Sequence, residues 1–386
     1  MLWCIFTVSK PSRLSKVFNK FSCLLLFPLI AVSYFILQRP KPPLPQLAIL
    51  EKDMGSDVLV KEPFFTSMVI PQLDFLKTAH SATLEVLPSG NLIALWFAGT
   101  TEGHPDVQIW QSKFDGAQWS MAQAVISPKI ITQATSSFIK CVGNPVIYLS
   151  KDRTLHLFVV SVSLGGWSGS RLNHFISTDE GDSWNSGKQL ILSPLLNIST
   201  LARTRAISLE DGGFYLPAYR EIIRTSPVLI RFDKNGQFTE QIFPKSAGFL
   251  LQPAILTLGR DHAYMYLRNK NTKDNVLYFQ ESLDGGMTWQ AALPTNLINQ
   301  DTSLAVHMVD ENQFLMVYNP RERNSLAIAL SNDGIHWEQK YVLESSSKGL
   351  FSYPAIQAHG DVIDLLYTWE SKGIKHVRFN LAWLYR

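Results

Sequence analysis

Two stretches of the sequence, STDEGDSW at residues 177–184 and SLDGGMTW at residues 282–289, share the pattern Ser-x-Asp-x-Gly-x-x-Trp. Three degenerate versions occur elsewhere: SKFDGAQW ending at Trp119, RFDKNGQF ending at Phe238 and SNDGIHW ending at Trp337. The closing aromatic residues of the five stretches are separated by 65, 54, 51 and 48 residues. A repeat period near fifty residues is typical of the blades of a β-propeller.

Segments in which apolar and polar residues alternate accompany these octets. Two such segments precede each octet position, and the arrangement recurs in six consecutive periods. The second segments are NLIALWFAGT, TLHLFVVSVS, GFYLPAYREI, HAYMYLRNK, QFLMVYNPRE and VIDLLYTWES. Alternation bounded by turn residues predicts one four-stranded antiparallel blade per period. The sixth period is one strand short, and PFFTSMVI at 63–70 has no partner before the first. We therefore predict an all-β, six-bladed propeller over residues 63–386, closed by this N-terminal strand.

The octet itself predicts a tight turn between the third and fourth strands of a blade. Its Ser and Asp oxygens are suited to accept hydrogen bonds from backbone N–H groups. Gly181 and Gly286 stand where the turn needs a positive φ, and the Trp is expected to pack between blades. The octet therefore indicates a structural staple and not a catalytic motif.

The composition is that of a globular protein, with 46% hydrophobic, 11% aromatic and 17% charged residues. The net charge of +3 arises in the first 45 residues, which hold six basic and no acidic side chains. Subtracting these six from the total leaves 29 basic against 32 acidic residues, without a basic run, which argues against a nucleic-acid partner. Only one of the three cysteines, Cys141, lies in the predicted propeller, and no Cys or His cluster predicts a metal site or a cofactor.

The N-terminal part of the sequence divides into three segments. Residues 1–20 are basic and predict a cytoplasmic segment, and residues 21–38 are apolar and uncharged, which predicts a transmembrane anchor or a signal sequence. The basic residues before the apolar run favour a single-pass, N-in orientation with the propeller on the extracytoplasmic side. Cleavage of the segment would instead release a secreted protein. Residues 39–62 are rich in Pro and predict an extended linker.

Octets of this kind on a fifty-residue period resemble the Asp-boxes of sialidases (neuraminidases) and their relatives. The resemblance implies a site at the end of the central channel where the first strands of the blades begin. In this family three arginines hold the substrate carboxylate, because a planar guanidinium matches its geometry. A Tyr acts as nucleophile, a Glu removes its proton, and an Asp acts on the leaving oxygen. The implied activity is that of an exo-acting glycoside hydrolase that removes a terminal acidic sugar, such as sialic acid, from a glycan or glycoconjugate.

Several residues of this chain match the family pattern. Tyr353 in SYPAI opens the sixth blade at the nucleophile position, and Arg268 in YMYLRNK resembles one arginine of the triad. Arg321 or Arg323 in NPRERN resembles another. In the first blade, TEGHPD supplies Glu102 or Asp106 as the expected acid. The further residues expected to line the pocket by their place near a strand start are His80 and Asn144.

Two departures from the family pattern bear on the activity. Val69 in MVIP stands where sialidases carry an arginine, and Arg205 or Arg203 of the third blade is the expected substitute. Gln252 in QPAIL stands where sialidases carry the Glu that serves the Tyr, and Glu221 in AYREI is the expected replacement. A Tyr without such a base is a weak nucleophile at its ordinary pKa of about 10.

These departures leave two alternatives to a sialidase-type hydrolase. The first is a propeller without catalytic activity that binds a glycan or a protein through the retained arginines. The second is a lyase that uses Tyr and His to abstract a proton from the uronate of a polysaccharide. Assays of a sialoside and of a uronate polysaccharide discriminate among the three.

Overall fold

The structure is a computed structural model that describes residues 44–49 and 62–386, apart from 186, 195, 196, 223, 247, 272 and 311. The chain divides by its internal contacts into two units, Met1–Leu44 and Pro45–Arg386. The predicted basic segment (1–20) and the predicted membrane segment (21–38) lie outside the described residues. Within the described ranges, no helix is long and apolar enough to cross a membrane.

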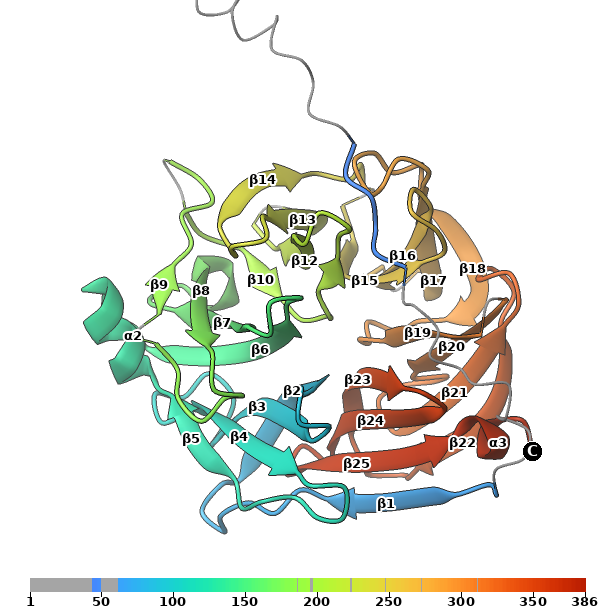
Figure 1. The fold of residues 1–386 in the computed structure, drawn as a ribbon, viewed down its shortest axis with the longest axis horizontal. Coiled ribbons are helices and arrows are strands. Elements are labelled where there is room, and N and C mark those ends of the chain that lie inside the picture. Colours follow the sequence, from blue (N-terminus) through green and yellow to red (C-terminus); the bar gives the residue numbers. More distant parts are fainter. Residues whose placement is uncertain are drawn as a thin grey trace, which may run out of the picture. The chain divides into compact units, whose positions relative to one another are not determined.

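The unit Pro45–Arg386 confirms the prediction of an all-β, six-bladed propeller, with six antiparallel sheets arranged in a ring (Figure 1). The first blade contains β2 (Thr78–Val86), β3 (Leu92–Gly99), β4 (Gln108–Phe114) and β5 (Gln123–Ile126). The second contains β6 (Cys141–Leu149), β7 (Leu155–Val162), β8 (Ser170–Ser177) and β9 (Lys188–Gln189). The third contains β10 (Leu201–Ala202), β11 (Ile207–Ser208), β12 (Phe214–Arg220), β13 (Ser226–Phe232) and β14 (Phe238–Ile242).

The remaining blades follow the same order from the inside of the ring outward. The fourth contains β15 (Leu250–Thr257), β16 (Ala263–Asn269), β17 (Val276–Ser282) and β18 (Leu293–Ile298). The fifth contains β19 (Ala305–Asp310), β20 (Gln313–Tyr318), β21 (Ser325–Ser331) and β22 (Glu338–Ser345). The sixth contains β23 (Phe351–His359), β24 (Val362–Trp369), β25 (Gly373–Asn380) and β1 (Phe65–Val69). The helical turns are α2 (Pro128–Thr135), η2 (Gly166–Gly169) and α3 (Leu381–Leu384).

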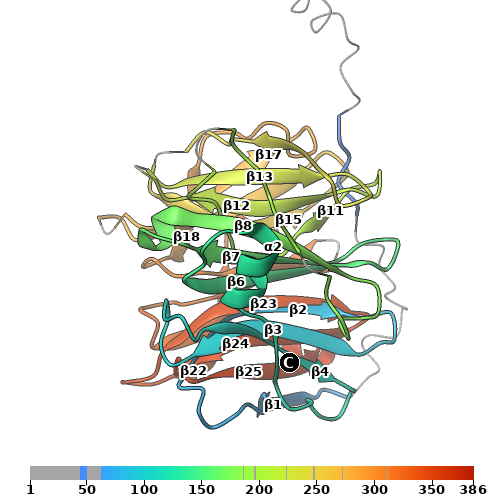
Figure 2. The same ribbon diagram turned by 90° about the vertical axis from the view of Figure 1, so that its left-hand side faces the viewer.

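The ring is closed by its own two ends, as the unpaired N-terminal segment predicts. Strand β1 pairs with β25 in antiparallel register from Phe65 opposite Phe379 to Val69 opposite Lys375. In both views the blue strand β1 lies beside the red strand β25 (Figure 1, Figure 2). Because this pairing covers the outer edge of β25, the sixth blade is completed by residues more than three hundred positions away.

The core is divided among the six blade interfaces. Six clusters of buried apolar side chains occur in the described part of the unit. Five join residues of two neighbouring blades, and the cluster between the second and third blades also includes Leu251 of the fourth. Trp96, for example, is fully buried between the first and sixth blades, and Phe214 is buried between the second and third. Successive side chains of a strand point to opposite faces of its sheet, so each blade directs one set of side chains toward the preceding blade and the other set toward the following blade.

The octets connect the third and fourth strands of their blades, as predicted. In the first octet the Ser177 hydroxyl accepts a hydrogen bond from the Gly181 N–H (2.8 Å), and Asp179 accepts one from the Ser183 N–H (2.9 Å). Gly181 has a φ of 86°. The Trp184 indole donates to Gln111 of the first blade (3.0 Å), so the octet ties two neighbouring blades together.

The aromatic position of the octet is not equally buried in all copies. Trp289 is 8% exposed, whereas Trp184 is half-buried and Phe238 of the degenerate third copy is 37% exposed. The expectation that the Trp packs between blades is therefore confirmed for Trp289, whereas Phe238, which replaces the Trp in the third copy, is exposed. Phe238 opens strand β14, directly after a turn in which Asp233 accepts hydrogen bonds from the N–H groups of Asn235 (2.9 Å) and Gln237 (2.8 Å).

Five residues from the range that we expected to be a linker pack against the propeller. Leu47 is 1% exposed, forms a bridge with Leu209 and donates its N–H to the Arg260 carbonyl (2.7 Å). Ala48 donates to the Ser208 carbonyl (2.9 Å). Residues 45–49 therefore contact the third and fourth blades.

Candidate functional site

The innermost strands of four blades carry the same irregularity near their first residues. A single residue adopts a left-handed conformation and the pairing register shifts around it. These residues are Ser81 (φ 60°), Asn144 (φ 40°), Gln252 (φ 49°) and Tyr353 (φ 54°). A bulge of this kind redirects a side chain, at a cost of about 1–2 kcal/mol for a residue other than Gly. The strained positions include Tyr353, Gln252 and Asn144, which the sequence singled out.

Tyr353 is surrounded by cationic and aromatic side chains from three other blades. The guanidinium carbons of Arg203 and Arg323 lie 5.2 Å and 6.0 Å from the centre of the Tyr353 ring, within cation–π range. The His80 ring lies edge-on to that of Tyr353, with 6.2 Å between ring centres. Arg203 also donates from Nη2 to the carbonyls of Tyr353 and Pro354. The structure thus brings Tyr353, His80 and Arg323 together, and it selects Arg203 over Arg205 at this point.

Arg268 is held from two sides. It is 7% exposed, and its Nε donates to Asp301 Oδ1 (2.7 Å) while Nη1 donates to Gln252 Oε1 (3.1 Å). Burial by itself would lower the pKa of Arg268, but the oxygens of Tyr353 and Asp301 raise it above its ordinary value. Arg323 donates to the Asp301 carbonyl (3.4 Å), so one residue bridges the two arginines. Both therefore present fixed positive charge next to Tyr353.

Gln252 is occupied by neighbours other than Tyr353. Its Nε2 donates to the Tyr219 hydroxyl (3.2 Å), and its Oε1 accepts from Arg268. Burial raises the pKa of Tyr219, which stays protonated at neutral pH. Among the described residues, the Tyr353 hydroxyl makes no hydrogen bond, so no carboxylate contacts it. Tyr219 was not predicted, because it stands within an apolar alternating strand.

The two acids of TEGHPD have different surroundings. The Asp106 carboxylate accepts hydrogen bonds from the Thr100 N–H (3.0 Å), the Thr100 hydroxyl and His104 Nδ1 (2.6 Å). Its pKa is lowered, because these hydrogen bonds outweigh the opposing effect of burial. Asp106 therefore stabilises its own loop. Glu102 lies at the surface among crowded side chains, and this partial desolvation raises its pKa against the opposing charges of Arg323 and Arg268.

Trp167 forms a wall of the site that the sequence did not predict. It stands on η2, which interrupts the connection between β7 and β8, and its indole lies close enough to Glu102 to oppose the rise in the pKa of that carboxyl group. A Cβ at Gly143 would come within 2.7 Å of the Trp167 ring, so only Gly permits this packing. The adjacent residue is Asn144, which places the second-blade bulge beside Trp167. The signal in the sequence was GGWSG, a Gly-rich insertion that carries a single aromatic.

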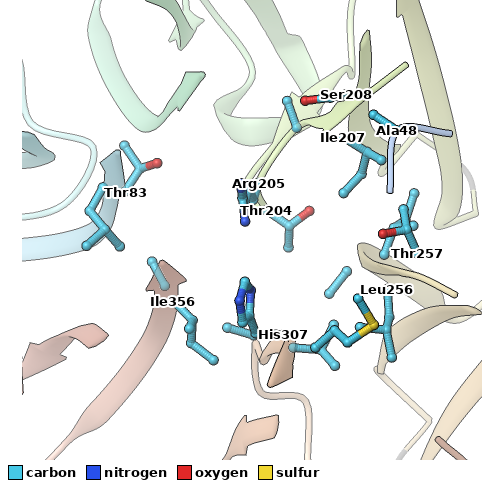
Figure 3. A pocket seen from close by; sticks show the side chains of 18 of the residues that line it. Ala48, Thr83, Thr204, Arg205, Ile207, Ser208, Leu256, Thr257, His307 and Ile356 are labelled. Atoms are coloured by element: carbon cyan, nitrogen blue, oxygen red, sulfur yellow. The ribbon is translucent and has the colours of Figure 1, made fainter. Parts of the chain in front are cut away.

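Three expected residues are located elsewhere. The Glu221 carboxylate pairs with Lys270 (3.3 Å) and, within the described ranges, makes no hydrogen bond to Tyr353. Arg321 is exposed and lines a separate depression with Ser345 and Ser346, so the choice between the two arginines of NPRERN falls on Arg323. Arg205 faces a cavity further along the ring axis (Figure 3). In the described part of the chain, Glu221 is therefore paired with Lys270 and not with Tyr353.

Comparison with known proteins agrees with this architecture. The chain belongs to the family of BNR repeat-like domains, which matches residues 90–365. A protein of unknown function from Dyadobacter fermentans has a similar structure, with a TM-score of 0.65 and 14% identity, covering 81% of this chain and 97% of that one. A sequence comparison with curated proteins found no match.

Two sialidase structures are similar as well. The Trypanosoma rangeli sialidase has a TM-score of 0.66 and 15% identity, covering 84% of this chain and 61% of that one. The NanB sialidase from Streptococcus pneumoniae has a TM-score of 0.64 and 12% identity, covering 81% of this chain and 70% of that one. At these identities the likeness establishes the fold, which is that of a sialidase-like propeller.

Proposed function

We propose that this propeller is an exo-acting glycoside hydrolase of sialidase type, which removes a terminal acidic sugar. The observation that supports the proposal most is the convergence of Arg268 and Arg323 beside Tyr353. Two fixed guanidinium groups suit the carboxylate of an acidic sugar. Arg203 holds the Tyr353 backbone in place by donating a hydrogen bond to its carbonyl. The Trp167 ring offers an apolar face for the sugar.

In the proposed reaction the Tyr353 oxygen forms a bond to the anomeric carbon as the bond to the leaving oxygen breaks. Glu102 donates a proton to the leaving oxygen, a role suited to a carboxyl group with a raised pKa. Water then attacks the anomeric carbon, Glu102 takes the proton of that water, and the bond to Tyr353 breaks. As the Tyr353 oxygen attacks, its hydroxyl proton is transferred to His80, whose pKa burial lowers to about 4, so that the imidazole is neutral at pH 7. His80 returns this proton to the Tyr353 oxygen when the bond to the sugar breaks.

A second candidate function is recognition of an acidic glycan without hydrolysis. Gln252 favours it, because this amide occupies the position that resembles the sialidase Glu and cannot accept a proton. The change Gln252→Glu discriminates the two functions, since Tyr219 and Arg268 would donate hydrogen bonds to the new carboxylate as well. An inactive parent that binds sialic acid and gains turnover with Gln252→Glu would establish the recognition function.

The test of the hydrolase uses a fluorogenic sialoside and, in parallel, a uronate polysaccharide followed by ultraviolet absorbance of an unsaturated product. Tyr353→Phe removes one oxygen that makes no hydrogen bond in the described structure, so we expect an unchanged Tm and a turnover lower by roughly 10³-fold or more. Tyr219→Phe, a matched change of the neighbouring Tyr, should retain most of the turnover. Parental turnover in Tyr353→Phe would refute the nucleophile, and an unsaturated product would identify a lyase.

We also propose, from the sequence pattern, that residues 21–38 anchor the chain in a membrane with the propeller on the extracytoplasmic side. Protease added to intact cells should then digest the propeller or release it. Complete protection in intact cells, with digestion after lysis, would contradict this orientation.

A further inference from the structure

A cavity of about 660 Å³ lies along the ring axis beyond the Tyr353 site. Arg203 and Pro354 belong to both, so they separate the two spaces. The cavity is lined by the inner strands of several blades, among them Thr83 of β2, Leu256 of β15 and Ile356 of β23 (Figure 3). Its volume is in the range of sites for small organic ligands, about 300–1,000 Å³.

Arg205 is the charged group of this cavity without a partner. Within the described residues its guanidinium makes no hydrogen bond and no ion pair, and its Nε is buried. His307 of β19 faces it across the cavity, and its side chain likewise makes no hydrogen bond to the described part of the chain (Figure 3). Burial, with the charge of Arg205, lowers the pKa of His307 to about 3, so the imidazole is neutral and does not repel Arg205.

Glu85, the acid whose pKa Arg205 affects, does not neutralise Arg205. Glu85 is 6% exposed, and its carboxylate accepts hydrogen bonds from the N–H groups of Val86 (3.1 Å) and Leu149 (3.4 Å) and from the Gln357 amide. Arg205 lowers the pKa of Glu85, which burial raises, but the two groups form no ion pair. A half-buried guanidinium with unused donors is a costly arrangement unless an anion or water completes it.

The rest of the lining is largely apolar. Apolar residues, among them Leu256, Leu304, Val306 and Ile356, make up more than half of the residues that line the cavity. The other charged residues of the lining are Lys151, Arg203, Glu210 and Arg260. Arg203 donates to the carbonyls of Tyr353 and Pro354, Lys151 donates to the Glu210 carbonyl (3.2 Å), and Arg260 pairs with the Glu210 carboxylate (2.9 Å). The cavity therefore combines apolar side chains with one cation, Arg205, that makes no hydrogen bond to the described residues, and this combination is the complement of an amphipathic anion.

We propose that this cavity is a second binding site, which takes a carboxylate with an apolar body. The carboxylate accepts hydrogen bonds from Arg205, and the apolar body lies along Leu256, Val306 and Ile356. This site is distinct from the Tyr353 site and does not depend on the activity proposed there.

The test measures binding of octanoate and of 1-octanol to the full-length protein by calorimetry. A charge-assisted hydrogen bond to Arg205 predicts that octanoate binds roughly ten- to a hundredfold more tightly than octanol. Arg205→Met should abolish that preference while leaving octanol binding unchanged. The retained octanol binding shows that Arg205→Met is folded. Val306→Trp, which fills the cavity and alters no charge, should abolish binding of both compounds and so tests whether they bind in this cavity.

Two matched Arg→Met changes locate the ligand. Arg260→Met tests the exposed mouth, and Arg323→Met tests the Tyr353 site; we expect both to retain the octanoate preference. Equal binding of octanoate and octanol, or a parental preference in Arg205→Met, would overturn the proposal and leave a water-filled channel. Loss of the preference in Arg323→Met with retention in Arg205→Met would move the anion to the Tyr353 site.

Discussion

Trp289 offers the sharpest test of the claim that the octets are staples between blades. Its side chain is 8% exposed, donates from Nε1 to the Gly286 carbonyl (2.9 Å) and packs in the cluster between the third and fourth blades. Trp289→Ala removes a large buried side chain, which typically costs about 3–5 kcal/mol. At roughly 2 °C per kcal/mol for a large domain, Tm should fall by roughly 6–10 °C in calorimetry.

Phe238 provides the matched control, because it occupies the same repeat position but is 37% exposed. Phe238→Ala should change the free energy of unfolding by no more than about 1 kcal/mol. Sialoside turnover of folded Trp289→Ala should equal that of the parent, since the octet lies outside the Tyr353 site. Equal Tm shifts for the two variants would refute the reasoning, because burial would then not decide the contribution of the octet aromatic.

Three further predictions concern closure, pH and the site. Deletion of residues 63–72, which contain β1, should expose the edge of β25 and cause aggregation on size exclusion; a monomer with the parental Tm would disprove closure. Burial lowers the pKa of His80 and His156 to about 4 and of His174 and His307 to about 3. Below about pH 6.5 these histidines therefore bind more protons in the unfolded chain than in the folded one, and the free energy of unfolding should fall between about pH 6.5 and about pH 4. Unfolding at pH 5.5 without uptake of protons would contradict this prediction. Arg268→Lys should weaken sialic-acid binding in calorimetry by roughly tenfold, and unchanged affinity would exclude Arg268 from the site.

The fold was predictable because its signals are local. Alternation with period two and the octet turns are properties of short segments, and the missing strand of the sixth blade followed from counting them. The burial of the octet aromatics was less predictable. Phe238 closes the copy that lacks the Ser, and nothing in its own segment indicated that it would begin an exposed strand.

The site was predictable only in part, because it joins loops from different blades. Arg321 and Arg323 stand two residues apart in one turn, and only the path of that turn determines that Arg323 approaches Tyr353. The sequence also contains a signal for the shared bulge, since a Pro follows each of Asn144, Gln252 and Tyr353 at the same place in their blades. A residue before Pro is restricted in conformation, so a repeated X-Pro at a strand start indicates a shared backbone feature.

The pairing of β1 with β25 has a consequence for how the chain is made. Strand β1 is synthesised first but pairs with β25, which is synthesised last, so this pair cannot form until the whole ring has been made. Contacts between such distant segments form slowly, and until then two sheet edges stay open to other chains. A nascent propeller of this design therefore keeps a sheet edge open to pairing with other chains until its final residues have been synthesised.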